Sequence, residues 1–203
     1  YYQFAAFFNN TRDSDLNDDW PRVQVPTNPQ DAEAANELDK QIRELRNEIW
    51  HREFTVTSDP SRWQPITSLS AKTNNATRVD VEAKPTHAEY FTVDTVSRNT
   101  TIQLTAELPS RLKQITAIRV TALPLNPDQA ITDSEWGFVL SNVKAHWLLP
   151  DNSGTRPIEI ARVMIDEPDP YYDPQESLNE KSKRGFSAYS RIHYPRTAAF
   201  VLK

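Results

Sequence analysis

Thr101-Ile102-Gln103-Leu104-Thr105-Ala106 decides the fold class, because apolar and polar residues alternate strictly along this stretch. Such alternation places the apolar side chains of a strand on one face and the polar ones on the other. The same period of two recurs in runs rich in Thr, Val and Ile at residues 54–57, 78–82, 91–93, 115–120, 138–147, 158–165 and 199–201. Eight or nine short strands without alternating helices predict a mostly β protein, an antiparallel β-sandwich or jelly roll.

One of these runs is long enough to need an irregularity. Apolar residues alternate from Phe138 to Leu140 and again from Val143 to Trp147, but the phase changes between them. A bulge shifts the phase of a strand by one residue. The sequence therefore predicts one long strand over residues 138–147 with a bulge near Ser141-Asn142.

The segment before the strands predicts one long amphipathic helix, over residues 30–53 of a helix and linker region at 28–53. Asn28-Pro29 is a start signal, and acidic residues follow it where the helix dipole favours them. A single apolar stripe then repeats at spacings of four, three and four, through Leu38, Ile42, Leu45 and Ile49. Two heptads are too few to assign a coiled coil, so a helix docked on its own or a neighbouring domain is the preferred interpretation.

The first 27 residues differ in character from the rest. The run Tyr1-Tyr2-Gln3-Phe4-Ala5-Ala6-Phe7-Phe8 has aromatic residues at helical spacing, and an acidic, turn-rich stretch follows it. We expect this part to be the end of an upstream domain. The chain begins without Met and has no signal-peptide pattern, which indicates a processed protein or a piece of a longer one. The predicted organisation is a stub at 1–27, the helix at 28–53 and the β-sandwich at 54–203.

Composition excludes several classes of function. Lys and Arg total 23 against 28 for Asp and Glu, a formal net charge of −5 that argues against an electrostatic nucleic-acid binder. No apolar run approaches the roughly 18 residues of a membrane span. The absence of cysteine excludes disulfides, zinc fingers and thiol nucleophiles, and three glycines leave no Gly-rich phosphate loop. The four histidines lack metal-ligand spacing, and no nucleophile elbow or metalloprotease motif is present.

Two central segments carry a resemblance to a known family. Residues 115–124 read ITAIRVTALP and residues 137–143 read GFVLSNV. They resemble the signature "ITxLRLEALPD … GNFVLSEF" of large multidomain proteins of planctomycete-type bacteria. In those proteins a cytochrome-c-like domain and two domains of unknown function flank a discoidin-like, galactose-binding-like β-sandwich. Residues 1–11 look like the end of the first domain of unknown function, and residues 185–201 look like the family's "GWA … HTAVFEL" strand.

The resemblance implies a galactose-binding-like sandwich, a periplasmic, cell-surface or extracellular location in a bacterium, and a binding role beside flanking domains of the same polypeptide. This chain departs from the pattern at residues 126–136, where the family's loop is rich in glycine. It also departs at Phe186 and Arg196, where the family has Trp and His.

Loop aromatics beside polar residues are the candidate ligand-binding groups. Aromatic faces stack on sugars, while carboxylates and guanidinium groups bind hydroxyls. The candidates are Trp136, Asp133, Glu135, Tyr171, Tyr172, Arg191 and Tyr194. The alternative is that each aromatic only packs under a loop or closes an end of the sandwich. No organic cofactor is expected; a structural calcium ion held by Asp128, Asp133 and backbone oxygens is a further alternative.

The function predicted from these features is a non-catalytic binding module for a glycan or polysaccharide within an exported multidomain bacterial protein. The alternative is a structural spacer or interaction domain that organises neighbouring redox or catalytic domains. The amphipathic helix and the aromatic stub favour that alternative, because both need partners. A stand-alone hydrolase is the third hypothesis, without any visible nucleophile or base constellation to support it. No nucleic acid and no membrane span are expected.

Overall fold

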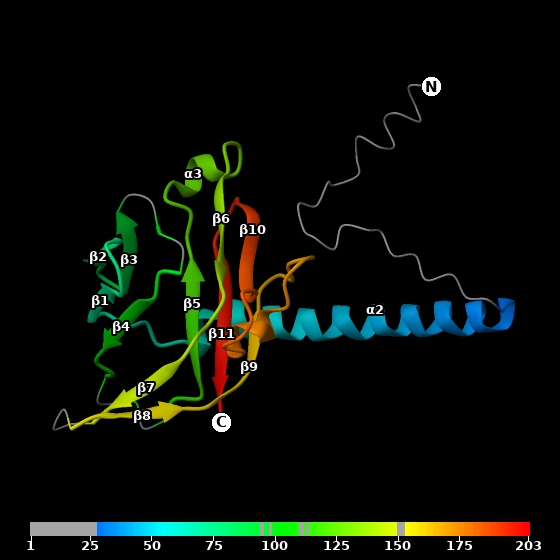
Figure 1. Ribbon diagram of the computed structural model, residues 1–203, viewed down its shortest axis with the longest axis horizontal. Coiled ribbons are helices and arrows are strands. Elements are labelled where there is room, and N and C mark those ends of the chain that lie inside the picture. Colours follow the sequence, from blue (N-terminus) through cyan, green and yellow to red (C-terminus); the bar gives the residue numbers. More distant parts are fainter. Residues whose placement is uncertain (1–27, 94–95, 98, 110–111, 113, 150–152) are drawn as a thin grey trace. The chain divides into compact units, whose positions relative to one another are not determined.

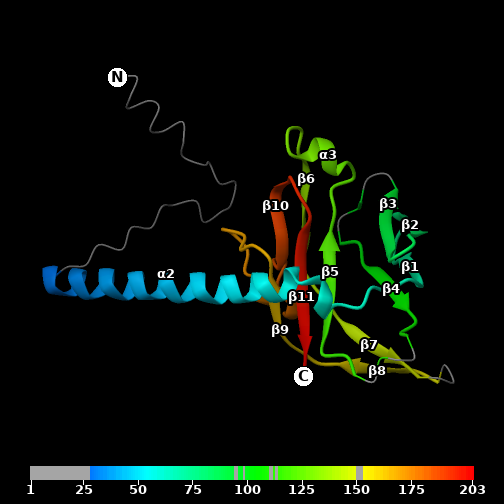
Figure 2. The same cartoon turned by 180° about the vertical axis from the view of Figure 1, so that it is seen from behind.

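The computed structural model describes residues 28–93, 96–97, 99–109, 112, 114–149 and 153–203, so the expectations for residues 1–27 lie outside the described part. The chain divides into two compact units, Tyr1–Arg46 and Asn47–Lys203. The described elements (Figures 1 and 2) are α2 (Pro29–Ser58), η1 (Pro60–Arg62), β1 (Leu69–Thr73), β2 (Arg78–Ala83), β3 (Ala88–Val93), β4 (Ile102–Ala106), β5 (Ala117–Ala122), α3 (Pro127–Ala130), β6 (Glu135–Leu140), β7 (Ala145–Leu148), β8 (Thr155–Ile158), β9 (Ile160–Ile165), η2 (Pro174–Leu178), β10 (Phe186–Ile192) and β11 (Arg196–Leu202).

The predicted helix is present and continues through residues 54–57, where the alternation predicts a strand. α2 runs to Ser58, so the strand prediction at residues 54–57 was wrong. The Thr55 hydroxyl donates to the His51 carbonyl at 2.8 Å and that of Thr57 to the Glu53 carbonyl at 2.9 Å. These bonds hold both β-branched residues within the helical turn. Four alternating residues were too few to distinguish a strand from a helix end that is buried at Thr57.

The rest of the described chain is mostly β and antiparallel, as predicted. The stretch at residues 101–106 forms β4, which pairs with β1, and two further pairs are β2–β3 and β7–β8. A three-stranded sheet has the order β5–β11–β9, with β11 in its centre (Figure 1), and β10 pairs with β6. None of these described sheets closes into a barrel. β1 was not predicted from the sequence.

The expected long strand at residues 138–147 is divided into two. β6 ends at Leu140 and pairs with β10, whereas β7 begins at Ala145 and pairs with β8. Between them, the Val143 amide donates to the Ser177 carbonyl at 2.9 Å. This bond directs the intervening backbone to η2 and away from either ladder. The irregularity near Ser141-Asn142 is therefore a break between strands, where a bulge was predicted.

The main core joins two of the sheets. It contains fully or almost fully buried side chains of β9, β10 and β11, packed against half-buried residues of β5 and β6; the buried members are Val163, Ile165, Phe186, Ala198 and Phe200. Phe138 and Phe186 meet edge to face, with ring centroids 5.2 Å apart. Aromatic pairs favour such a tilted arrangement. This packing holds β6 and β10 in place, and these two strands carry the most exposed of the candidate residues.

Candidate functional site

Trp136 and Arg191 form the centre of the candidate site. They face each other in the register between β6 and β10, and the Arg191 guanidinium lies 4.2 Å from the centre of the Trp136 ring. Arg191 also donates to the Ser134 carbonyl at 3.0 Å. Even with this cation beside it, the Trp136 side chain is 80% exposed. The arrangement is a large aromatic surface steadied by a cation–π contact and open to a ligand.

An irregularity in β10 sets this pairing. Ala188 faces Phe138 and Arg191 faces Trp136, so β10 has one more residue than β6 between the two pairs. An extra residue is a β-bulge, and it changes the direction of the side chains that follow it. Gly137 lies opposite the bulge, where a Cβ atom would come within 1.7 Å of the Ala188 carbonyl oxygen. The close approach of the two backbones thus requires glycine at this position.

The two acidic candidates beside Trp136 have different surroundings. The Glu135 carboxylate accepts hydrogen bonds from the backbone amides of Leu125 and Asn126, both at 2.8 Å. Glu135 therefore braces the loop before α3. Asp133 has an exposed side chain in the turn after α3, where its amide donates to the Gln129 carbonyl at 2.7 Å. Of these two residues, Asp133 is the one whose carboxylate has no structural bond within the described part of the chain.

The same loop exposes apolar residues that the sequence interpretation had not selected. Leu125 is 80% exposed and Ile131 is 71% exposed. Both belong to the loop segment that Glu135 braces. No sequence signal marked them, because single apolar residues are common on protein surfaces as well as in cores.

Tyr171 and Tyr172 pack against a third tyrosine. Their ring centroids lie 6.2 Å and 5.0 Å from that of Tyr189 on β10, and both are half-buried. Arg184 lies 6.0 Å from the Tyr172 ring, and burial is the main cause that raises the pKa of the Tyr172 hydroxyl. The pair is thus partly engaged in packing, in line with the alternative interpretation of these residues. Tyr189 was not among the candidates predicted from the sequence.

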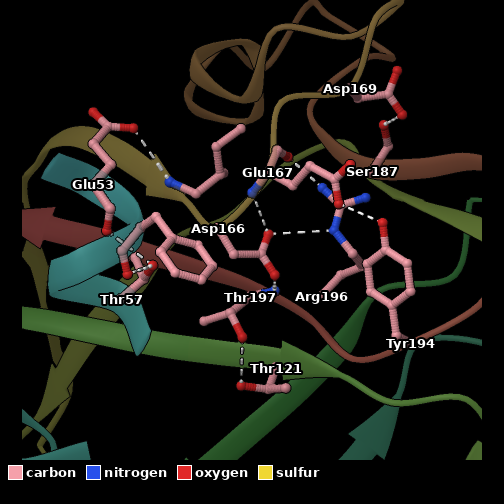
Figure 3. Close-up of polar contacts among 12 residues, drawn as sticks. Glu53, Thr57, Thr121, Asp166, Glu167, Asp169, Ser187, Tyr194, Arg196 and Thr197 are labelled. Atoms are coloured by element: carbon pink, nitrogen blue, oxygen red, sulfur yellow. Dashed lines mark hydrogen bonds and ion pairs between the residues drawn. The ribbon is translucent and has the colours of Figure 1, made fainter. Parts of the chain in front are cut away.

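Asp169 positions this tyrosine cluster, and the sequence interpretation missed it. Its carboxylate accepts from the Tyr171 amide at 2.8 Å, the Ser187 hydroxyl at 2.8 Å and the Tyr189 amide at 3.2 Å. The bond to Ser187 is drawn in Figure 3. An Asp two residues before an aromatic pair, with Pro170 between, is an Asx-turn signal that could have identified it.

The seventh candidate, Tyr194, belongs to a third group of residues. Its hydroxyl donates to the Glu167 carboxylate at 2.5 Å (Figure 3), and this bond is the first cause that raises the Tyr194 pKa. The side chain is 47% exposed. The structure therefore brings Trp136 and Arg191 together, gathers Tyr171 and Tyr172 around Tyr189, and sets Tyr194 against Glu167.

Asp166 and Arg196 form a buried ion pair near Tyr194. Asp166 accepts from the Arg196 guanidinium at 3.3 Å and from the Thr197 amide at 2.7 Å, as Figure 3 shows. Arg196 also donates to the Glu167 carbonyl. The Trp50 indole of α2 donates to the Asp166 carbonyl at 2.5 Å. These bonds connect β9 and β11 with the part of α2 that belongs to the second unit. The role of this network is structural.

Burial raises the pKa of two carboxyl groups in this region. For Asp166 the loss of solvation outweighs the opposing effect of Arg196, and for Glu53 it outweighs that of Arg162. A raised folded-state pKa means that the ionised form is relatively disfavoured in the folded protein. Each group therefore contributes stability that is complete below its unfolded pKa and is lost as the pH rises through the folded pKa.

We expect the Glu53→Gln variant to reveal this linkage. Because the amide keeps an acceptor but cannot titrate, wild type should lose free energy of unfolding relative to the variant as pH rises from about 4 to about 7. Urea unfolding of both proteins across this range measures the difference. Glu159→Gln, which removes a carboxylate that is 72% exposed, is the matched control. A difference that stays constant or grows in favour of wild type would contradict the prediction.

The described part of the chain contains neither a metal-binding cluster nor a membrane-spanning helix. In that part of the chain, no three or more His, Cys, Asp or Glu side chains cluster in a way that could hold a metal ion. The calcium alternative at Asp128 and Asp133 and the expectation of no cofactor stay predictions. Nor does any helix in the described ranges have both the length and the apolar character needed to cross a bilayer.

Comparison of the chain with protein-family models, curated proteins and solved structures found no match. The resemblance described above therefore stays an expectation.

Proposed function

We propose that the protein is a non-catalytic carbohydrate-binding module and that Trp136 is its stacking platform. The observation that carries the proposal is the exposed indole, 80% accessible while Arg191 lies 4.2 Å from its centre. Covering a large apolar ring with a ligand removes its surface from water, which is favourable by roughly 25 cal/mol per Å² of apolar area. Sugars present flat C–H faces, which suit an aromatic surface of this kind.

The polar groups near the platform complete the proposed site. Arg191 uses one N–H to hold the Ser134 carbonyl, and a guanidinium has further N–H donors for sugar hydroxyls. The exposed Asp133 carboxylate supplies acceptors on the same loop. Tyr171, Tyr172 and Tyr194 are proposed as secondary contacts through their accessible parts, whereas Glu135 supports the site by bracing the loop.

We also propose the finer description of the fold and its setting. The core shared by the β5–β11–β9 and β10–β6 sheets supports a galactose-binding-like sandwich, in which these sheets are the two layers. The signature at residues 115–124 and 137–143 supports placing the chain in an exported multidomain protein of planctomycete-type bacteria. A binding module beside catalytic or redox domains of the same polypeptide fits this setting.

The proposal predicts that Trp136→Ala weakens binding of oligosaccharides at least tenfold. Truncation of a central aromatic hot spot commonly costs about 2 kcal/mol or more of binding free energy, and each 1.4 kcal/mol is tenfold in affinity. Titration calorimetry against a panel of neutral, acidic and sulfated oligosaccharides measures the effect, and Trp136→Phe should retain most of the affinity because it keeps a stacking ring.

The matched control is Trp147→Ala, which removes a second exposed tryptophan from β7, a strand of another sheet. It should leave the affinity unchanged. Wild-type protein that binds no member of the panel would contradict the proposal, as would equal losses from both alanine variants.

The exposed Leu125 and Ile131 favour a second candidate function, a spacer or interaction domain. Tryptophan and arginine beside exposed aliphatic side chains are typical of protein interfaces. The double variant Leu125→Ser, Ile131→Ser separates the two candidates. Sugar binding on the Trp136 platform should survive it, whereas association with a flanking domain should not.

A further inference from the structure

We propose that helix α2 pairs in antiparallel orientation with α2 of a second copy of this chain. The helix exposes its entire apolar stripe: Leu38 is 58%, Ile42 43%, Leu45 58% and Ile49 54% exposed. The free energy of this exposure is recovered when the stripe is covered by another apolar surface. The proposal does not depend on the carbohydrate site.

The spacing of the stripe matches a coiled-coil seam. In a heptad, Ile42 and Ile49 occupy the a positions and Leu38 and Leu45 the d positions. The flanking core positions, Ala35 and Arg52, are not large apolar residues, so the seam has four apolar layers. In an antiparallel pair these layers are two of Leu38 with Ile49 and two of Ile42 with Leu45.

The charges beside the seam select the antiparallel orientation. In that orientation e positions face e positions, so Asp39 of each copy meets Arg46 of the other. The g positions face g positions, so Gln41 meets Glu48. In a parallel pair Glu48 would instead face Glu53 of the second copy, a like-charge contact. Antiparallel pairing therefore gains two attractive contacts and avoids two repulsive ones.

The side chains that would form these contacts are available. Asp39 and Arg46 are exposed and take part in no ion pair within the described ranges. By contrast, Glu48 is bonded to Arg52 at 2.6 Å on its own helix, and Glu53 is bonded to Arg162 of β9. Among the charged residues beside the seam, Asp39, Arg46, Glu48 and Glu53, the two without an ion pair in the described part of the chain are thus the two that antiparallel pairing brings together.

The length of α2 agrees with the same arrangement. The midpoint between Ile42 and Leu45, where the two-fold axis would cross, is also the midpoint of Pro29–Ser58. The four apolar layers would then lie about the middle of both helices. Because α2 is already helical, pairing does not carry the cost of nucleating a helix, which is what makes short coiled coils marginal.

Sedimentation equilibrium of the full chain tests the pairing. We expect a concentration-dependent monomer–dimer equilibrium, and Asp39→Arg or Arg46→Asp alone should weaken it about tenfold by creating two like-charge contacts. The double variant Asp39→Arg, Arg46→Asp should restore wild-type affinity. Glu33→Arg, the same change on the opposite face of the helix, is the control and should have no effect.

Disulfide trapping tests the orientation without altering charge. Because the chain contains no cysteine, an introduced thiol reports only on its own neighbour. Oxidation of a mixture of Leu38→Cys and Ile49→Cys chains should give the mixed dimer in preference to either self-dimer. A chain that stays monomeric, single charge variants without effect, or preferential Leu38→Cys self-dimers would each overturn the proposal.

Discussion

Replacing Arg196 by Met is expected to lower the free energy of unfolding by about 3–5 kcal/mol. The side chains of Arg196 and Asp166 are only 9% and 14% exposed, so the substitution leaves a carboxylate in the interior without its cation. The Glu167 carbonyl loses a donor at the same time. Urea unfolding at neutral pH measures the loss.

Two comparisons make the Arg196 result specific. Arg78→Met breaks an exposed ion pair with Asp80 and should cost at most about 1 kcal/mol. The loss in Arg196→Met should also shrink as the pH falls, because the buried Asp166, whose pKa is already raised, becomes neutral on protonation. Equal losses at positions 78 and 196, or a loss that grows on acidification, would contradict the assignment of a buried ion pair.

Replacing Gly137 by Ala is expected to destabilise the protein by about 3 kcal/mol, the upper part of the range for overpacking. The new Cβ would lie 1.7 Å from the Ala188 carbonyl oxygen and 2.8 Å from that of Tyr189. Both are backbone atoms of the β10 bulge, so relief requires β6 and β10 to separate. Chemical unfolding gives the loss of stability.

The matched control is Gly154→Ala. No heavy atom lies within 4 Å of its Cβ position, so only backbone strain at a φ of 158° opposes the substitution. It should cost clearly less than Gly137→Ala. If the two variants are equally stable, the close approach at the bulge is not a constraint on the fold.

Local pattern predicted the class of structure but not which strands pair. The alternation at residues 101–106 identified β4, and the stripe from Leu38 to Ile49 identified α2. The end of α2 was misassigned because contacts with distant residues stabilise it, such as the bond from Arg119 to the Thr57 carbonyl at 3.0 Å. Alternation within a segment contains no information on such contacts.

The candidate site was predictable to a similar extent. A tryptophan beside acids in a loop marked residue 136, but its pairing with Arg191 depends on the register of β10, which the sequence does not reveal. Glu135 was predicted as a ligand group, and its carboxylate also bonds two backbone amides. A glutamate can serve either as a ligand-binding group or as a brace for the backbone. Only the positions of the Leu125 and Asn126 amides show that Glu135 is a brace.

The Glu135 brace also has an evolutionary consequence. Because one carboxylate fixes the backbone at Leu125 and Asn126 to the start of β6, both ends of the intervening loop are anchored independently of its tip. The tip can then accept substitutions and insertions without disturbing the pairing of β6 with β10. A short loop with anchored ends is a place where the sequence can diversify while the scaffold is retained.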